Sequence, residues 1–142
     1  MARLCPTDYH RFHFPFSCHA SSVKVINGFL YSVNPLALSK NIEIFTENTR
    51  VISTLTSEIF GEVIFIEVGA TNVGSIHQTY REGTVQKGEE KGYFSFGGSS
   101  LILLFEEGRI VFDQDLIEAG KTGVEIKCLM GQPMGENKKA NL

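Results

Sequence analysis

The sequence turns most sharply within residues 94–105, Phe94-Ser95-Phe96-Gly97-Gly98-Ser99-Ser100-Leu101-Ile102-Leu103-Leu104-Phe105. Two glycines and two central serines lie between aromatic residues and an unbroken apolar run. Glycine gives a tight turn its backbone freedom and serine can hydrogen-bond its own turn, so the stretch predicts a strand, a corner and a buried strand. The corner also brings the Ser99 hydroxyl within reach of the Gly98 carbonyl, which no bulky side chain shields. On these residues alone a purely structural turn is the favoured interpretation, because glycine–serine turns are common.

The composition outside this stretch indicates one globular domain. A chain of 142 residues can bury a sizeable core without disulfides or metals, and its formal net charge of −3 gives no reason to expect a nucleic-acid partner. The three cysteines, Cys5, Cys18 and Cys128, are widely spaced and odd in number, which favours free thiols in a reducing compartment. No apolar run approaches the ~20 residues of a transmembrane helix, and no secretory signal is visible at the N-terminus.

The chain predicts many short strands. We expect strands over residues 50–56, 62–68, 73–80, 101–105, 109–112 and 124–130, with 62–68 as the most apolar and the central one. Asn27-Gly28 predicts a hairpin joining strands 23–26 and 29–33, because both residues tolerate positive φ. One helix is expected over 114–119, with Asp113 as its N-cap and Gly120 as its stop, and 36–41 is a loop or a single helical turn.

These elements indicate a mainly β fold, a compact sandwich or barrel-like domain with one or two short helices. Regularly spaced glycines in 82–94 resemble the hammerhead turns of lipoyl- and biotinyl-type barrels, so the fold class is barrel-sandwich-hybrid-like. A lipoyl-like carrier resting on Lys87 is a further alternative. It is not favoured, because the carrier lysine belongs at a hairpin tip between hydrophobic flanks and no such tip is evident.

An aromatic, histidine-rich run occupies residues 7–16 and favours a strand that Pro15 ends. In an extended strand Tyr9, Arg11 and His13 share one face, and His10 shares the other with two phenylalanines. On a helical turn His10 and His13 would share a face and could ligate a metal, but no third ligand lies nearby, so we expect no metal. From these residues alone, two histidines at a strand edge is the simpler interpretation.

Six segments in this order resemble the phosphatidylserine decarboxylase family. They cover roughly residues 3–135 and most resemble bacterial members with a Gly-Ser-Ser cleavage site. The matching segments are Pro6-Thr7-Asp8-Tyr9-His10-Arg11-Phe12-His13-Phe14-Pro15, Tyr31-Ser32-Val33-Asn34-Pro35, Phe45-Thr46-Glu47-Asn48, Val68-Gly69-Ala70-Thr71-Asn72-Val73-Gly74-Ser75-Ile76, Lys87-Gly88-Glu89-Glu90-Lys91-Gly92-Tyr93-Phe94 and Phe96-Gly97-Gly98-Ser99-Ser100.

The resemblance gives the Gly98–Ser99 corner a chemical role. It implies that Ser99 attacks the Gly98 carbonyl, that the resulting ester eliminates, and that residue 99 becomes a covalent pyruvoyl group. The products would be a β chain of residues 1–98 and an α chain of 99–142. The pyruvoyl group, as a Schiff-base site for the substrate amine, would then act as the electron sink that decarboxylates phosphatidylserine to phosphatidylethanolamine in phospholipid biosynthesis.

The family pattern also implies roles for both histidines. His13 matches the base that activates the serine, and His10 matches a residue for proton transfer or substrate contact. Partners implied are phosphatidylserine in a bilayer and the chain's own two fragments, with a homo-oligomer possible. The implied location is a peripheral one on the cytoplasmic side of a membrane.

The chain departs from the family pattern in two ways. The family's triad aspartate and its amphipathic membrane helices lie upstream of the histidine run, so the chain is expected to be an N-terminally truncated single catalytic domain, 1–142. Asp8 matches a different family position and does not replace that aspartate. Cys5 stands where the family usually has alanine, and Cys18, where it usually has glycine, is expected to strain a turn. The alternative to an active enzyme is therefore a catalytically silent, uncleaved β module of the same family.

Overall fold

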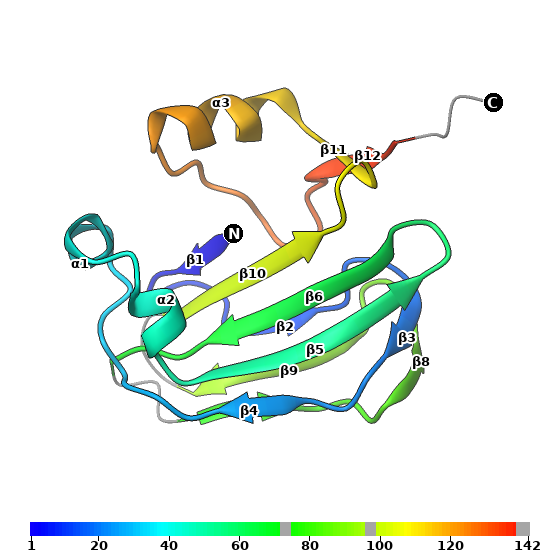
Figure 1. The fold of residues 1–142 in the computed structure, drawn as a ribbon, viewed down its shortest axis with the longest axis horizontal. Helices are drawn as coiled ribbons and strands as arrows, with labels where there is room; N and C mark the ends of the chain where they lie inside the picture. The colour runs from blue at the N-terminus through cyan, green and yellow to red at the C-terminus, as the bar shows by residue number, and fades with distance from the viewer. Residues whose placement is uncertain (72–74, 96–98, 139–142) are drawn as a thin grey trace.

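The computed structural model describes residues 1–71, 75–95 and 99–138. Two layers of β strands form its core (Figure 1). In the described ranges the strands and helices, in chain order, are β1 (Ala2–Leu4), β2 (Arg11–His13), β3 (Cys18–Ala20), β4 (Lys24–Ile26), α1 (Pro35–Lys40), α2 (Ile44–Glu47), β5 (Arg50–Ser57), β6 (Gly61–Val68), β7 (Ser75–Gln78), β8 (Gly83–Val85), β9 (Glu90–Ser95), β10 (Ser99–Phe105), β11 (Ile110–Phe112), α3 (Gln114–Thr122) and β12 (Gly135–Asn137).

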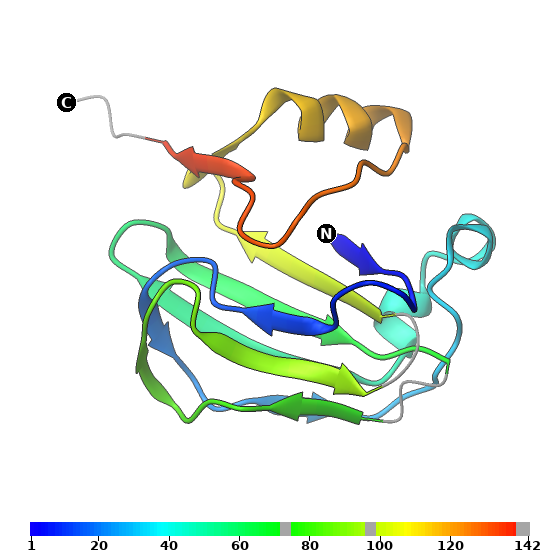
Figure 2. The ribbon, with the colours of Figure 1, turned by 180° about the vertical axis from the view of Figure 1, so that it is seen from behind.

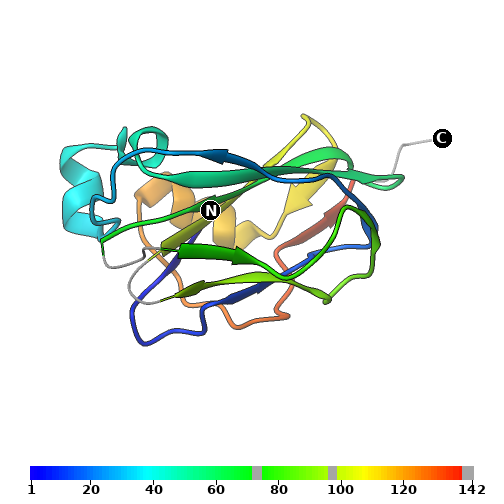
Figure 3. The same cartoon turned by 90° about the horizontal axis from the view of Figure 1, so that it is seen from below.

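A seven-stranded sheet and a three-stranded sheet form the two layers (Figure 3). The larger sheet has the order β1-β10-β6-β5-β3-β8, with β4 also paired to β5, and the smaller one has the order β2-β9-β7. Aromatic rings from the two layers meet in the core, as in the edge-to-face contact of Phe12 with Phe65. The expectation of a mainly β, sandwich-like domain is therefore confirmed.

The longest strands follow the predicted alternation of buried and exposed residues. In β5 every second residue from Val51 to Ser57 is buried, and β5 pairs with β6 along the whole of both strands. β6 lies between β5 and β10, so the prediction of a central apolar strand over 62–68 is confirmed. Alternation of this kind gives one face of the sheet to the core and the other to the outside.

Among the described residues three short helices lie outside the sandwich, where one or two were expected. α1 begins after Asn34, whose side chain accepts a hydrogen bond from the Ala37 amide, and α1 and α2 lie together at one end of the large sheet. α3 and the β11–β12 pair lie beside β10, away from β4 and β8 (Figures 1 and 2). No residue of α3 is buried, so the helix contributes no residue to the buried core.

The predicted hairpin at Asn27-Gly28 is wrong. Residues 24–26 form β4, but their partner is β5, and residues 29–33 form no strand. The buried Asn48 accepts a hydrogen bond from the Tyr31 amide and donates to the Tyr31 and Gly69 carbonyls, so this segment is fixed beside residues 47–49. Gly28 is needed there for close approach, because a Cβ would lie 2.0 Å from the Glu47 carbonyl oxygen.

Two predictions in the C-terminal third are also wrong. Residues 124–130 are not a strand. The partner of β11 is instead β12, at 135–137. The α3 helix continues past Gly120 to Thr122 and ends at Gly123, whose φ of 68° is the left-handed conformation of a helix C-cap. Asp113 does precede the helix as its N-cap residue, although its side chain makes no capping hydrogen bond.

Candidate functional site

Ser99 is the first residue of β10 and lies in the interior of the protein. It pairs with Leu4 of β1, while the next residue, Ser100, pairs with Arg3 of β1 and Val68 of β6. Both serines are fully buried, and neither hydroxyl has a hydrogen-bond partner in the part of the chain that the structure describes. A buried hydroxyl without a partner costs about 1–3 kcal/mol, so stability alone does not explain a serine here. Gly98, the other half of the expected cleavage site, lies outside the described residues.

The register of β10 shows which way Ser99 faces. Alternate residues of a strand share a face, so Ser99 shares its face with Leu101 and Leu103, and both leucines pack against the buried core. Leu101 lies directly opposite Glu67 of β6, which places Glu67 on that face too. The Ser99 hydroxyl and the Glu67 carboxylate are therefore both on the inner side of the large sheet.

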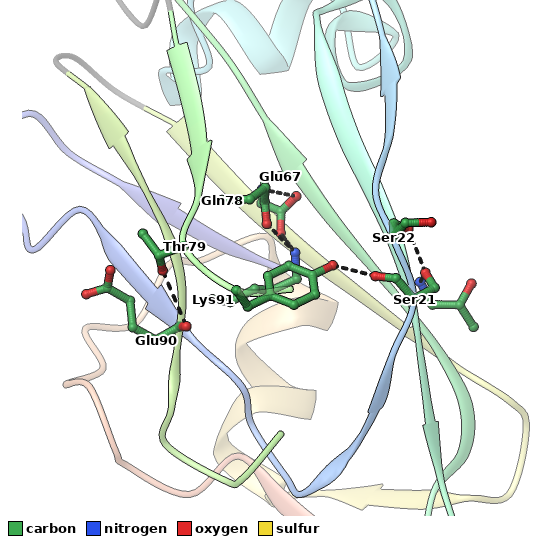
Figure 4. Close-up of polar contacts among 9 residues, drawn as sticks. Ser21, Ser22, Glu67, Gln78, Thr79, Glu90 and Lys91 are labelled. Carbon is green, nitrogen blue, oxygen red and sulfur yellow. Dashed lines mark hydrogen bonds and ion pairs between the residues drawn. The ribbon is translucent and has the colours of Figure 1, made fainter. Parts of the chain in front are cut away.

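Glu67 belongs to a buried ionic cluster with Lys91 and Gln78 (Figure 4). Lys91 of β9 and Glu67 of β6 have no exposed side-chain surface, and the Lys91 ammonium lies 2.5 Å from Glu67 Oε1. Lys91 also donates to Gln78 Oε1 of β7 at 2.8 Å, and Gln78 Nε2 lies 3.4 Å from Glu67 Oε2. The cluster thus joins the two layers of the sandwich by charged and polar groups.

The surroundings of the cluster determine its protonation. Burial raises the pKa of Glu67 from 4.5 to about 7, although the Lys91 ammonium acts in the opposite direction. Burial likewise lowers the pKa of Lys91. Rings of Tyr80 and Phe65 lie 4.9 and 5.1 Å from the Lys91 ammonium and offer it their π faces. A carboxyl group of this kind can exchange a proton near neutral pH.

His13 is the last residue of β2, in the other layer, and its ring stacks against the ring of Tyr9. Its Nδ1 lies 2.9 Å from the Gly88 carbonyl and its Nε2 lies 2.8 Å from the Tyr9 hydroxyl. A carbonyl only accepts, so Nδ1 carries the proton and Nε2 accepts from Tyr9 in the neutral ring. The predicted face sharing of Tyr9 and His13 is confirmed. The structure does not bring His13 into hydrogen-bond contact with Ser99.

His10 lies at the opposite end of the β2–β9 pairing from His13. Its Nδ1 lies 2.7 Å from the Asp8 carbonyl oxygen, and its own carbonyl accepts a hydrogen bond from the Phe94 amide at 3.0 Å. Phe94 is the second-last residue of β9, so His10 is placed at the end of that strand from which the chain continues toward Ser99. Of the two histidines, His10 has the same sequence parity as the buried Phe12 and Phe14.

The cluster of Glu67, Lys91 and Gln78 is not predicted from the sequence. A signal for Glu67 was present: it occupies an inward position in the most apolar segment of the chain, with Val63 and Phe65 at the two preceding inward positions. Buried glutamates and lysines almost always have a charged partner, so an inward glutamate predicts a lysine or arginine on a facing strand. Which residue is the partner depends on the packing of the two sheets.

The three cysteines form no disulfide, and the described residues offer neither a metal site nor a membrane-spanning helix. All three cysteines are free, and Cys18 lies in β3 opposite Val85, so the strained turn expected at Cys18 is wrong. Burial raises the pKa of the Cys18 thiol to about 11.

Across residues 1–71, 75–95 and 99–138, no three histidine, cysteine or acidic side chains are grouped to hold a metal ion. Within the same ranges no helix has the length and apolar character needed to cross a bilayer.

Fold and site together describe a β-sandwich domain with a polar, water-excluded interior beside a buried serine. Among known proteins, the family model described as phosphatidylserine decarboxylase matches residues 1–136. The chain therefore belongs to the phosphatidylserine decarboxylase family, as the six segments predict.

Similar curated proteins come from Chlamydia. The phosphatidylserine decarboxylase proenzyme of Chlamydia trachomatis serovar L2b is 54% identical over 138 residues, and that of Chlamydia felis is 52% identical over 137. The proenzyme of Chlamydia pneumoniae is 49% identical over 142 residues. These alignments cover 96–99% of this chain and 46–47% of the relatives, so the chain spans about half the length of the proteins that it matches.

Proposed function

We propose that this chain is the self-cleaving catalytic part of a pyruvoyl-dependent phosphatidylserine decarboxylase, a carboxy-lyase of phospholipid biosynthesis. Three facts support this: the chain belongs to the family, its relatives bear the name proenzyme, and Ser99 is buried with an unpartnered hydroxyl. The observation that carries most weight is Ser99 itself. It begins β10 directly after Gly97-Gly98, at a position where its hydroxyl contributes nothing visible to stability.

Cleavage at Gly98–Ser99 and formation of the pyruvoyl group would proceed in three balanced steps: an acyl shift, an elimination and a hydrolysis. The Ser99 hydroxyl loses its proton to a base and Oγ attacks the Gly98 carbonyl carbon; the C–N bond breaks, and the nitrogen of residue 99 takes up a proton as it becomes an amine. Loss of the Cα proton then breaks the Cβ–Oγ bond. This releases residues 1–98 with a free carboxylate, and water replaces the remaining nitrogen, which leaves as ammonia.

The pyruvoyl group formed in this way would supply the electron sink that decarboxylation requires and that no ordinary side chain offers. The residues present fit such a group, because Ser99 is the first residue of β10 and the pairing of β10 with β6 begins at Ser100, beyond the nitrogen that would be lost.

Following the family pattern, we assign His13 as the base for Ser99 and His10 to proton transfer or substrate contact. The ring nitrogens of His13 are bonded to Tyr9 and Gly88, so His13 could act on Ser99 only after these bonds are exchanged. His10 lies at the end of β9 from which the chain continues toward Ser99. Because phosphatidylserine is a bilayer lipid, we propose that the working enzyme is a peripheral membrane protein on the cytoplasmic side. A homo-oligomer is compatible with this proposal.

The second candidate is an uncleaved, catalytically silent β module of the same family. One observation favours it: the ring nitrogens of His13 are bonded to Gly88 and Tyr9 and not to Ser99.

Expression of the chain beside two serine variants separates the candidates. On a denaturing gel we expect two fragments, of 98 and 44 residues by the cleavage position, from the wild type and from Ser100→Ala, and one intact band from Ser99→Ala. Ser100 is the matched control because it is equally buried and equally without a partner. Release of carbon dioxide from carboxyl-labelled phosphatidylserine vesicles by the first two proteins, and not by Ser99→Ala, supports the enzyme. Three identical intact bands support the silent module.

A further inference from the structure

We propose that Asp8 is a positioning residue for His10: its side chain closes the turn at residues 5–8, and its carbonyl holds the His10 ring with the proton on Nδ1. This inference rests on the proposed function, which gives His10 proton transfer or substrate contact. It commits His10 to proton transfer, names the ring atom that transfers the proton, and names the residue that fixes the ring. Asp8 acts here through the backbone, not as the carboxylate of a catalytic triad.

Residues 5–8 form a turn that two hydrogen bonds close. The Asp8 amide donates to the Cys5 carbonyl at 2.9 Å, and Asp8 Oδ2 accepts from the Cys5 amide at 2.7 Å. Pro6 is the second residue of the turn, where its fixed φ favours the bend. The side chain of Asp8 therefore ties the end of the turn to its beginning, although the residue itself is exposed.

The carbonyl of Asp8 determines the tautomer of His10. His10 Nδ1 lies 2.7 Å from this oxygen, and a carbonyl can only accept, so Nδ1 carries the proton of the neutral ring. The lone pair that can take up a further proton is then on Nε2. When Nε2 takes up a proton, Nδ1 keeps its hydrogen bond to Asp8. The ring can therefore receive and return a proton at Nε2 without rotating.

The turn lies between His10 and the strand partner of Ser99. Leu4, the residue before the turn, pairs with Ser99 across β1 and β10. On the other side, the His10 carbonyl accepts a hydrogen bond from the Phe94 amide near the end of β9, from which the chain continues to Ser99. Two short stretches of chain thus connect His10 to the strand that carries Ser99. A change in the turn is expected to move the His10 ring relative to that strand.

A turn with no role beyond structure is the alternative, since aspartate side chains often bond to backbone amides in turns. Both interpretations include the two hydrogen bonds between Cys5 and Asp8. They differ in what happens to the His10 ring. Only the positioning role requires the ring proton to remain on Nδ1 while the Asp8 side chain is present and to redistribute when that side chain is removed.

The tautomer of His10 is measured by long-range proton–nitrogen correlation spectra of the full chain, labelled with nitrogen-15 histidine, at about pH 8.5, where imidazole is neutral. The chain has four histidines, and the His10 signals are those that His10→Gln removes. Every sample carries Ser99→Ala, so the spectra do not depend on cleavage. With Asp8 present we expect a protonated Nδ1 and an unprotonated Nε2 on His10.

Three substitutions separate positioning from a structural role. Asp8→Ala removes the acceptor for the Cys5 amide and should give the His10 ring a mixture of both tautomers. Asp8→Asn keeps an oxygen acceptor at the same position and should keep the proton on Nδ1. Asp113→Ala is the matched control, because Asp113 is an exposed aspartate whose side chain makes no capping hydrogen bond.

Decarboxylation by the same variants, made with Ser99 intact, tests what the fixed ring does. A positioned proton-transfer group contributes about 10²–10⁴-fold to a rate. With phosphatidylserine vesicles as substrate, Asp8→Ala should lower kcat about 10-fold and leave KM within about 2-fold, because a misoriented ring impairs the chemical step and not substrate binding. Asp8→Asn and Asp113→Ala should keep kcat within about 2-fold of the wild type.

The outcomes distinguish this inference from the proposed function. A His10 proton on Nε2 in the starting chain, a tautomer that Asp8→Ala leaves unchanged, or a kcat that Asp8→Ala leaves unchanged overturns the role of Asp8, and the proposed function stands. A chain that neither cleaves nor releases carbon dioxide overturns the proposed function, and the spectra still decide whether Asp8 sets the tautomer.

The same spectra report on folding. His19 lies in β3 and His77 in β7, so their ring signals should be the same in every variant if the sandwich is intact. If these signals change in Asp8→Ala, Asp8→Glu takes its place, because its longer side chain displaces the acceptor and keeps the charge. A His10 tautomer unchanged by Asp8→Glu then overturns the inference, and a redistributed proton supports it.

Discussion

Replacing Lys91 with methionine leaves the Glu67 carboxyl buried without its ammonium partner. Neither side chain has exposed surface, so water cannot compensate for the lost charge. Breaking a buried pair from one side typically costs about 3–5 kcal/mol of unfolding free energy. We expect Lys91→Met to lose this amount at pH 8, and the double variant Glu67→Gln/Lys91→Met to recover at least about 2 kcal/mol of it, because no uncompensated charge then remains.

The pH dependence of this loss follows from the pKa of Glu67. Its folded pKa is raised from 4.5 to about 7, so the folded chain binds a proton that the unfolded chain releases. The stabilisation from this proton is complete below pH 4.5 and disappears as the pH rises through about 7 in the wild type. Without Lys91 the folded pKa is higher still. Between pH 7 and 8 the variant should therefore lose about 1 kcal/mol more than the wild type, at 1.36 kcal/mol per pKa unit.

Urea unfolding of the uncleaved Ser99→Ala chain at pH 5.5, 7 and 8 measures these values. Lys87→Met is the matched control, because Lys87 is an exposed lysine four residues earlier on the same motif and its loss should change stability by less than about 0.5 kcal/mol. A Lys91→Met chain as stable as this control, or equally destabilised at all three pH values, would refute the reasoning about the buried pair.

Three further predictions concern the described core and its thiols. Gly92→Ala should lower the unfolding free energy measured in urea by about 1–3 kcal/mol, because its Cβ would lie 2.1 Å from a backbone carbonyl oxygen. Gly120→Ala, on the exposed helix, should instead raise the unfolding free energy slightly. Equal effects of the two substitutions would contradict this prediction. Asn48→Ala should lower the melting temperature by more than 8 °C, since three hydrogen bonds are lost in the interior; a shift below 2 °C would count against it. Iodoacetamide at pH 8 should modify the exposed Cys128 and leave Cys18 unmodified, because burial raises the Cys18 pKa to about 11. Peptide masses measure the labelling, and equal labelling of the two cysteines would overturn this prediction.

The sequence predicted the parts of the fold that local pattern determines. Alternating apolar residues located β5 and β6, and the short apolar runs located β10 and β11, because a strand with one buried face repeats every two residues. The Asn27-Gly28 hairpin failed for a non-local reason. The side chain of Asn48, about twenty residues away, bonds the backbone that would have formed the second strand.

In the candidate site, too, the residues within local motifs were predicted and those brought together by packing were not. The six segments led to Ser99 and to both histidines, since a motif is readable from residue types and spacing. The ionic cluster was not predicted, because Glu67, Gln78 and Lys91 come from three strands and meet only when the two sheets pack face to face. Likewise, the partners of His13 depend on the turn at Gly88, which brings a backbone carbonyl to the imidazole ring from 75 residues away.

The mass of the purified chain tests the central claim, cleavage at Gly98–Ser99, most directly. The account predicts two species in equal amounts, one of residues 1–98 with a free carboxylate and one of residues 99–142 that carries a pyruvoyl group in place of its first serine. The second species should react with a hydrazine through its ketone, and Ser99→Ala should give the single intact mass. An intact wild-type chain, or a 99–142 fragment that begins with an unmodified serine, would contradict the account.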